Sequence, residues 1–165
     1  MECENNNHPL ITFISVIKQQ HHIFLNKVLE EETEGVSAGQ TPYLMYLLYN
    51  EKICQDDLAK FYRQDKGVVA RGIRKLEENG LITKEIDKTN RRKYVLSLND
   101  KGRKLAEKII EINDEWETGI CSDLNIPKER VCELLELIAQ KTIEINKILT
   151  KMEDSNGRSQ RTERS

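Results

Sequence analysis

The sequence has no long apolar run. Its longest one, residues 43–49, contains seven residues, whereas a helix needs about 20 apolar residues to cross a bilayer. Residues 1–8 are acidic and polar, without the basic start and apolar stretch of a secretory signal. We therefore expect a cytoplasmic protein without a membrane partner.

Cysteine, histidine and catalytic motifs are also scarce. The adjacent His21 and His22 would point about 100° apart on a helix, so they do not readily hold one metal ion. Phosphate-binding loops, G-x-S-x-G and H-E-x-x-H are missing as well, and we expect no enzymatic activity, no cofactor and no metal site. The four cysteines form no C-x-x-C pair, which favours inert thiols. Oxidant sensing is the alternative, by Cys54 before a predicted helix or by Cys121 and Cys132 around a predicted turn.

Positive charge does not exceed negative charge overall, but it is concentrated in one segment. The chain has 26 basic and 28 acidic side chains and a net charge of −2. Residues 60–104 hold 14 of the basic and six of the acidic side chains, so this segment carries +8 and the remainder −10. This segregation indicates a polyanionic partner, and nucleic acid is the obvious one.

Three long segments with helical periodicity surround the shorter elements. Apolar residues recur at steps of three and four along residues 10–28, 105–120 and 131–152. A chain of this length cannot cover three such stripes by itself, so we expect a second copy to cover part of them. An ordinary monomeric bundle is the alternative. The predicted dimer interface comprises Leu10, Ile14, Ile17, Leu135, Ile138, Ile145 and Leu149.

The middle of the chain has shorter and closely spaced elements. A helix over residues 43–50 is predicted after Thr41 as its N-cap, and a second one over residues 55–62. A third helix begins after Asp65, a good N-cap, and ends at Gly80, which supplies a left-handed residue at the C-terminus. Three short helices in this order are typical of a helix-turn-helix domain.

A two-stranded hairpin is predicted after the third helix, over residues 81–87 and 93–98, with a polar basic tip between the strands. Helix, helix, helix, hairpin is the order of a winged helix-turn-helix. We therefore predict a mainly α protein whose DNA-binding domain has a two-stranded β wing. The predicted domains are the winged helix at residues 34–103, a helical dimerisation domain made from both termini at residues 1–33 and 104–153, and a disordered polar tail at residues 154–165.

The helix over residues 65–79 has one apolar face and one basic face. The apolar face is formed by Val69, Ile73 and Leu76. Its roughly opposite face carries Gly67, Ala70, Arg71 and Arg74. Small side chains allow a close approach to base edges, and arginine binds guanine in a bidentate manner or clamps phosphates. Lys66 adds a cation at the positive end of the helix dipole, where phosphate is favoured, although a solvated surface helix would have the same pattern.

The hairpin tip is a second cationic element. Its basic residues repel one another unless an anion neutralises them, and arginine on a projecting ribbon suits the minor groove. A solubilising turn is the alternative. The complete predicted set for double-stranded DNA is Lys66, Gly67, Ala70, Arg71, Arg74, Lys75, Lys88, Arg91, Arg92 and Lys93.

Four segments form a recognisable combination of motifs. They are QDDLAK at 55–60, residues 66–82 ending in KLEENGLI, Asp87 with NRR at 90–92, and LSLNDKG at 96–102. Together they resemble the MarR family (multiple antibiotic resistance regulators). The resemblance implies a triangular homodimer that regulates transcription, most often as a repressor, by binding a pseudo-palindromic operator. It places the 65–79 helix in the major groove and the 87–93 wing, led by Arg92, in the minor groove, although Asn90 stands where the family usually has aspartate.

An effector site and a different function class are further possibilities. Family members often respond to small phenolic or other anionic aromatic ligands in a crevice between the dimer helices and the DNA-binding lobe. This implies His8, His22, Tyr43, Tyr46 and Arg71 as candidates, although aromatic residues in this region are more often part of a core. The alternative to a DNA-binding regulator is a winged-helix protein-interaction module of a larger transcription or assembly complex.

Overall fold

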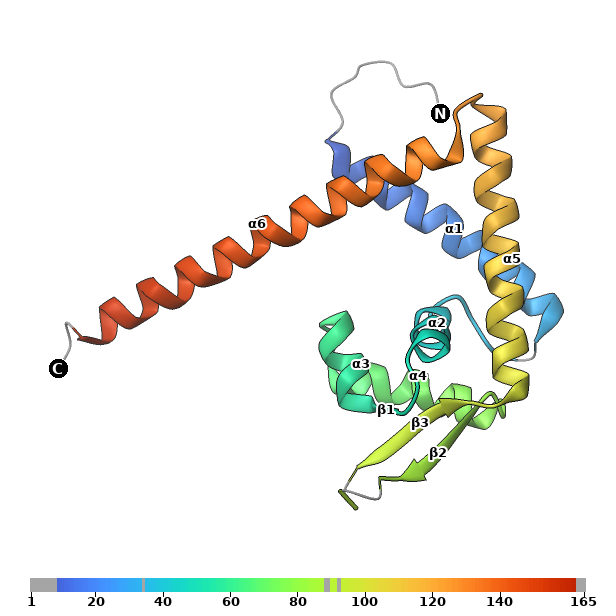
Figure 1. Ribbon diagram of the computed structural model, residues 1–165, viewed down its shortest axis with the longest axis horizontal. Helices are drawn as coiled ribbons and strands as arrows, with labels where there is room; N and C mark the ends of the chain where they lie inside the picture. The colour runs from blue at the N-terminus through green and yellow to red at the C-terminus, as the bar shows by residue number, and fades with distance from the viewer. Residues whose placement is uncertain (1–8, 34, 88–89, 92, 163–165) are drawn as a thin grey trace. The chain divides into compact units, whose positions relative to one another are not determined.

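The computed structural model describes residues 9–33, 35–87, 90–91 and 93–162, with the side chains of those up to residue 147 except residue 32. Its packing divides the chain into two compact units, Met1–Glu111 and Ile112–Ser165. The described helices are too short or too polar to cross a membrane. In chain order (Figure 1) the elements are α1 (Leu10–Glu32), α2 (Thr41–Tyr49), β1 (Ile53–Cys54), α3 (Gln55–Tyr62), α4 (Lys66–Glu78), β2 (Ile82–Ile86), β3 (Tyr94–Leu98), α5 (Asp100–Asp123) and α6 (Lys128–Thr162).

The predicted order of helices and hairpin is confirmed. The boundaries of the short helices and strands agree with the predictions to within about two residues, whereas α1, α5 and α6 extend beyond the apolar stripes by which the sequence marked them. Helix α2 already includes Thr41, because its hydroxyl donates a hydrogen bond backward to the Ala38 carbonyl oxygen at 2.9 Å instead of capping the helix. Residues 154–162, predicted as part of a disordered tail, continue α6 to Thr162. This stretch has no proline and a single glycine, so its backbone does not interrupt a helix.

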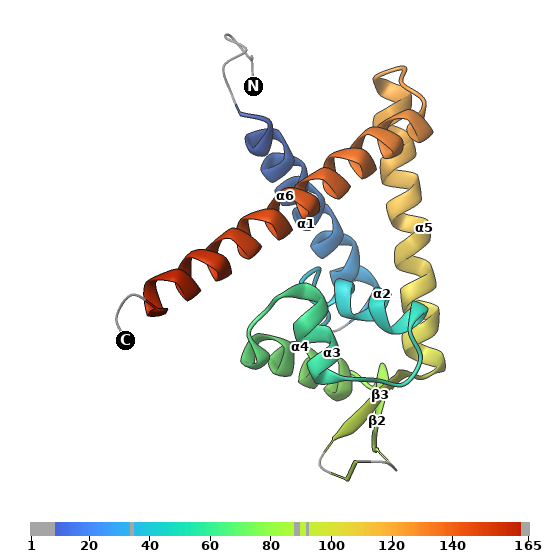
Figure 2. The same cartoon turned by 60° about the vertical axis from the view of Figure 1, so that its left-hand side comes forward.

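The wing belongs to a three-stranded antiparallel sheet with the order β1-β3-β2. The hairpin of β2 and β3 was predicted, and its register pairs Ile82 with Leu98 and Ile86 with Tyr94. The short strand β1 was not predicted, and it pairs Ile53 with Leu96 of β3. Figures 1 and 2 show the hairpin projecting from the helices of the same unit.

One apolar core joins the helices and the sheet of the first unit. Fully buried side chains come from α1, α2, α3, α4, β3 and α5, and from the turn before β2. These side chains are Leu25, Leu29, Leu44, Leu58, Val69, Ile73, Leu76, Leu81, Leu96 and Ile109. Because α4 and the hairpin share this core, their relative placement within the unit is fixed by packing.

The LSLNDKG segment connects the wing to α5. The Asn99 side chain donates to the Gly80 carbonyl oxygen at 2.8 Å and accepts from the Gly102 N–H at 2.9 Å, so it caps α5 and holds the turn after α4. A Cβ at Gly102 would lie 2.0 Å from the Leu81 carbonyl oxygen. Glycine is therefore required where the first turn of α5 crosses the turn before β2.

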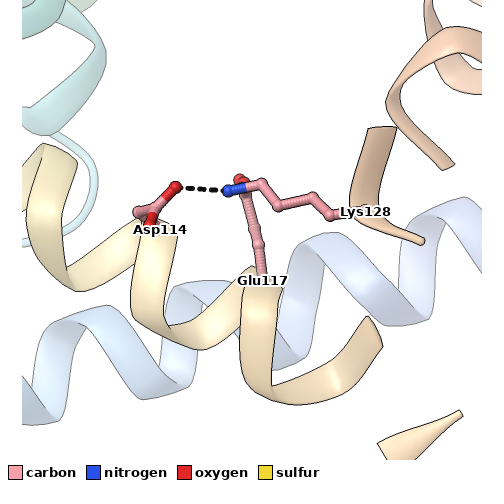
Figure 3. Close-up of polar contacts among 3 residues, drawn as sticks. All are labelled: Asp114, Glu117 and Lys128. Carbon is pink, nitrogen blue, oxygen red and sulfur yellow. Dashed lines mark hydrogen bonds and ion pairs between the residues drawn. The ribbon is translucent and has the colours of Figure 1, made fainter. Parts of the chain in front are cut away.

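The second unit contains the end of α5 and the whole of α6. Lys128 near the start of α6 binds two carboxylates of α5, with its Nζ 2.5 Å from an Asp114 oxygen and 2.9 Å from a Glu117 oxygen (Figure 3). Both acids hold the pKa of Lys128 well above its ordinary value. A hollow of about 610 Å³ beside this joint is lined by the buried Cys121 and the exposed Cys132, among others.

Candidate nucleic-acid interface

Helix α4 has the two faces that its sequence predicts. Asp65 caps it, with one side-chain oxygen accepting from the N–H groups of Gly67 and Val68 at 2.7 and 3.3 Å. Val69, Ile73 and Leu76 are buried, while Arg71 and Arg74 are exposed. Packing thus decides which side of α4 faces away from the core.

Gly72 lies in the middle of α4 against an aromatic ring. A Cβ at Gly72 would lie 2.3 Å from Cε2 of Tyr43 on α2. The Tyr43 ring is buried, and its hydroxyl donates to Oε1 of Gln64 at 2.6 Å. The space beside this glycine is therefore filled by a side chain of α2.

Lys66 at the start of α4 is bound to a carboxylate of α3. Its Nζ lies 2.6 Å from an Asp56 side-chain oxygen. Hydrogen bonding and the charge of Lys66 lower the pKa of Asp56, and the charge of Lys93 lowers it further. The same pair raises the pKa of Lys66. The Asp56 carboxylate therefore interacts electrostatically with Lys66 at the start of α4 and with Lys93 at the end of the wing turn.

The wing turn is closed by backbone hydrogen bonds and an aspartate. The Asp87 N–H donates to the Lys93 carbonyl oxygen at 2.9 Å, and the Lys93 N–H donates to the Asn90 carbonyl oxygen at 2.8 Å. An Asp87 side-chain oxygen accepts from the Asn90 N–H at 3.3 Å. Arg91 and Lys93 are exposed, as a nucleic-acid contact requires.

The base of the wing is attached to α4. Lys84 of β2 lies 3.7 Å from a Glu77 oxygen of α4. On its other side, the Lys84 Nζ lies 4.7 Å from the centre of the Tyr94 ring on β3. Lys84 therefore connects α4 to the base of the wing, and the two basic elements are held next to each other.

Comparison with known proteins identifies the family of this chain. The sequence model of the MarR family matches residues 36–94. YybA of Bacillus subtilis (strain 168), described as an uncharacterized HTH-type transcriptional regulator, is 31% identical over 117 residues, which cover 70% of this chain and 77% of YybA. The chain belongs to the MarR family. It is accordingly a MarR-type DNA-binding transcriptional regulator and not an enzyme, as its sequence predicts.

Solved MarR-family structures share the fold. The crystal structure of MarR is 27% identical, with a TM-score of 0.77 over 86% of this chain and 96% of that chain. The structure of the S. aureus MepR–DNA complex has a TM-score of 0.64 over 88% of this chain and 99% of that chain, at 22% identity. The mainly helical fold with a small antiparallel wing sheet is thereby confirmed.

The structure places most of the predicted MarR-type DNA contacts at the surface of the first unit. Exposed members are Lys66, Arg71, Arg74, Lys75, Arg91 and Lys93, and half-buried members are Gly67 and Ala70. Lys88 and Arg92 lie outside the described residues. The half-buried small residues and the exposed cations follow the division that the helix periodicity predicts.

The predicted effector residues differ in burial and in the side chains that they contact. Tyr43 is buried, and burial raises the pKa of its phenol. Tyr46 packs on Phe61, with ring centres 4.6 Å apart. His22 and Arg71 are exposed, and His8 lies outside the described residues. The 610 Å³ hollow of the second unit and a 380 Å³ hollow on the wing sheet are lined by other residues.

The predicted dimer residues form two exposed apolar stripes. Leu10 and Ile17 of α1 are 58% and 54% exposed. Leu135 and Ile145 of α6 are 47% and 49% exposed. Ile14 and Ile138 are half-buried, and Leu149 lies beyond the described side chains.

Two contributors to the interface were not found by sequence reasoning. Asp56, the partner of Lys66, is ten residues away across a turn, and no helical spacing links the two. Lys101 was noted in a motif, but its donation to the Asn79 carbonyl oxygen at 3.0 Å was not foreseen. Both interactions depend on how α3, α4 and α5 cross.

Proposed function

We propose that the chain acts as a homodimeric repressor that binds a pseudo-palindromic operator, with α4 in the major groove and the wing in the minor groove. The observation that carries the proposal is the division of α4: its apolar residues are buried, whereas Arg71 and Arg74 project from the protein. Arginine beside small residues suits guanine edges and phosphates. The MepR–DNA complex, which shares the fold, supports the same use of the domain.

The electrostatics support simultaneous contact by helix and wing. Lys66 at the start of α4 and Lys93 at the wing turn both act on Asp56, so they present positive charge around one place. A duplex phosphate backbone is an extended anion that can contact both. Arg92, which the sequence assigns to the hairpin tip, is expected to enter the adjacent minor groove.

Dimerisation is supported by the apolar stripes of α1 and α6. Among the side chains that the structure describes, six large apolar ones of α1 and five of α6 are exposed. Soluble monomers seldom leave contiguous apolar surface of this extent uncovered. Two-fold symmetry would then present two winged helices to two half-sites about one helical turn apart.

The test is a titration of the purified full chain with duplex DNA selected from genomic fragments. Saturation at one dimer per duplex is expected, with a loss of about 10³ to 10⁵ in affinity between about 50 and 200 mM salt. Arg71→Ala or Arg74→Ala should reduce discrimination between sites, and Arg92→Ala should weaken binding chiefly at A/T-rich flanks. Arg130→Ala on α6 is the control. A protein-interaction module would give no saturable duplex complex. If all three arginine variants bind DNA as well as the parent, the predicted DNA contacts are wrong.

Repression and its release are tested with the same duplex. Transcription from a promoter carrying the selected site should fall when the chain is added, whereas an activator would raise it. Release by a small anionic aromatic ligand, the effector class implied for Tyr43, Tyr46 and Arg71, is supported by the aromatic cluster next to α4. Salicylate and related anions should lower the DNA affinity, and unchanged affinity across a broad panel would exclude this part of the proposal.

A further inference from the structure

Three helices of the chain end in the same hydrogen-bonded turn. The closing residues are Arg63 after α3, Gly80 after α4 and Asn125 after α5. Each donates its N–H to the carbonyl oxygen three residues before it, at 3.4, 2.9 and 3.0 Å respectively. The next N–H donates to the carbonyl oxygen five residues before it, at 3.0, 2.9 and 3.0 Å. This is the pattern of the Schellman motif, which requires a left-handed residue at the closing position.

Arg63 is the exception among the three closing residues. The φ angles are +49° at Arg63, +63° at Gly80 and +54° at Asn125. Glycine adopts this conformation without steric cost, and asparagine tolerates it better than other residues. Arginine has neither advantage, so its Cβ strains a turn that glycine would close freely.

The side chain of Arg63 is not needed to hold this turn. The hydrogen bonds of the turn are made by backbone atoms alone, and the Arg63 side chain is exposed. Within the described residues, no ion pair involves Arg63, whereas Lys66 is bound to Asp56. A cation near a helix C-terminus is favoured by the dipole, but Lys60 already supplies one in the last turn of α3. Strain kept at an exposed residue indicates a function outside the fold.

We propose that Arg63 is a DNA-contacting residue whose guanidinium binds a backbone phosphate beside the groove that α4 enters. The inference rests on the proposed function. Arg63 lies in the three-residue turn between α3 and α4, directly before the N-terminus of α4. Phosphates line both edges of a groove occupied by such a helix, and an arginine fork matches their geometry. The interaction adds affinity and orientation without reading a base.

The test separates strain from binding by measuring both in one variant. In Arg63→Gly the strain and the charge disappear together, so the melting temperature should be no lower than that of the parent. Its affinity for the duplex selected by the parent should fall about tenfold. The slope of log affinity against log salt should become shallower by about 0.9 for each phosphate that the variant no longer neutralises. Arg63→Lys should retain the slope of the parent, because a cation remains.

Arg130→Gln on α6 is the matched charge control, and it should leave the slope unchanged. Equal affinity and slope for Arg63→Gly and the parent would overturn the proposal. So would an equal loss of affinity in Arg130→Gln, which would indicate a general charge effect, or a loss of stability in Arg63→Gly that accounts for its weaker binding. If the parent itself forms no saturable duplex complex, the proposed function fails first, which is a distinguishable result.

Discussion

Gly72 shows how a single residue affects the packing of α4. The ring of Tyr43 on α2 occupies the space where any other residue would place its Cβ. Tyr43 cannot easily move aside, because it is buried and its hydroxyl is bonded to Gln64. The sequence shows the glycine, but the identity of its neighbour depends on the crossing of two helices. Local propensity alone would favour alanine here.

Gly72→Ala should therefore lower the free energy of unfolding by about 1–3 kcal/mol, because overpacking against Tyr43 exceeds the gain in helix propensity. Gly119→Ala on α5 is the matched control: a Cβ there meets open space, and alanine should stabilise by about 0.5–1 kcal/mol. Urea denaturation of both variants measures the difference. A stabilised Gly72→Ala variant would mean that the ring yields without cost.

The Asp56–Lys66 pair should be visible in the titration of Asp56. Its pKa is lowered chiefly by Lys66, so Lys66→Met should raise the pKa of Asp56 toward its ordinary value, as measured by NMR of the side-chain carboxyl carbons. Lys75→Met, which removes an exposed lysine from the same helix, should leave it unchanged. An unchanged pKa of Asp56 in Lys66→Met would show that the pair does not form in solution.

The pair also sets a pH window for its small contribution to stability. The folded pKa of Asp56 is lowered, so the contribution is present above the unfolded pKa and is lost as pH falls through the folded value. The folded pKa of Lys66 is raised, so the contribution is present below its unfolded pKa and is lost as pH rises through the folded value. The pair is exposed, and its effect on stability remains minor at neutral pH.

At the scale of elements, the sequence predicts the helices whose first and last residues are determined by nearby capping residues. Helix α4 begins and ends as expected, because the Asp65 side chain and the left-handed Gly80 act within a few residues of themselves. Strand β1 was missed because two residues show no alternation, and its existence depends on pairing with Leu96. The left-handed backbone of Arg63 was missed for a similar reason, since it follows from how α3 turns into α4.

The ion pairs of Lys128 are expected to stabilise the joint between α5 and α6. Lys128 binds two acids of α5, so Lys128→Met should accelerate amide hydrogen exchange several-fold in residues 122–126. Lys141→Met, which removes only a pair within one turn of α6 with Glu144, should leave exchange at the joint unchanged. Because the pKa of Lys128 is raised, the contribution of these ion pairs to stability is fully present below the ordinary lysine value of 10.5 and is lost as pH rises above it. Equal exchange in the two variants would contradict a structural role for the joint.

At the scale of the whole molecule, the apolar stripes of α1 and α6 remain partly exposed. The predicted members Leu10, Ile17, Leu135 and Ile145 are each about half exposed, whereas the predicted core face of α4 is buried. Periodicity identified both sets correctly as apolar faces, but it could not say which face is covered within one chain. That distinction requires knowing what each helix packs against, and for α1 and α6 we propose that a second chain supplies the covering surface.

Ile145→Glu should convert the proposed dimer into monomers, because a carboxylate would have to lose its hydration in an apolar interface. Gln140→Glu places the same side chain at an exposed polar position of α6 and should remain dimeric. Light scattering after size exclusion measures the mass, and circular dichroism should show equal helix content, since Ile145 is not part of a core within the chain. A monomer holds only one half-site, so its affinity for the selected duplex should fall about 10²-fold or more, because the second half-site is no longer bound by a linked domain. A dimeric Ile145→Glu with parental affinity would place the interface elsewhere, whereas a monomer that still binds with parental affinity would show that one winged helix is sufficient for recognition.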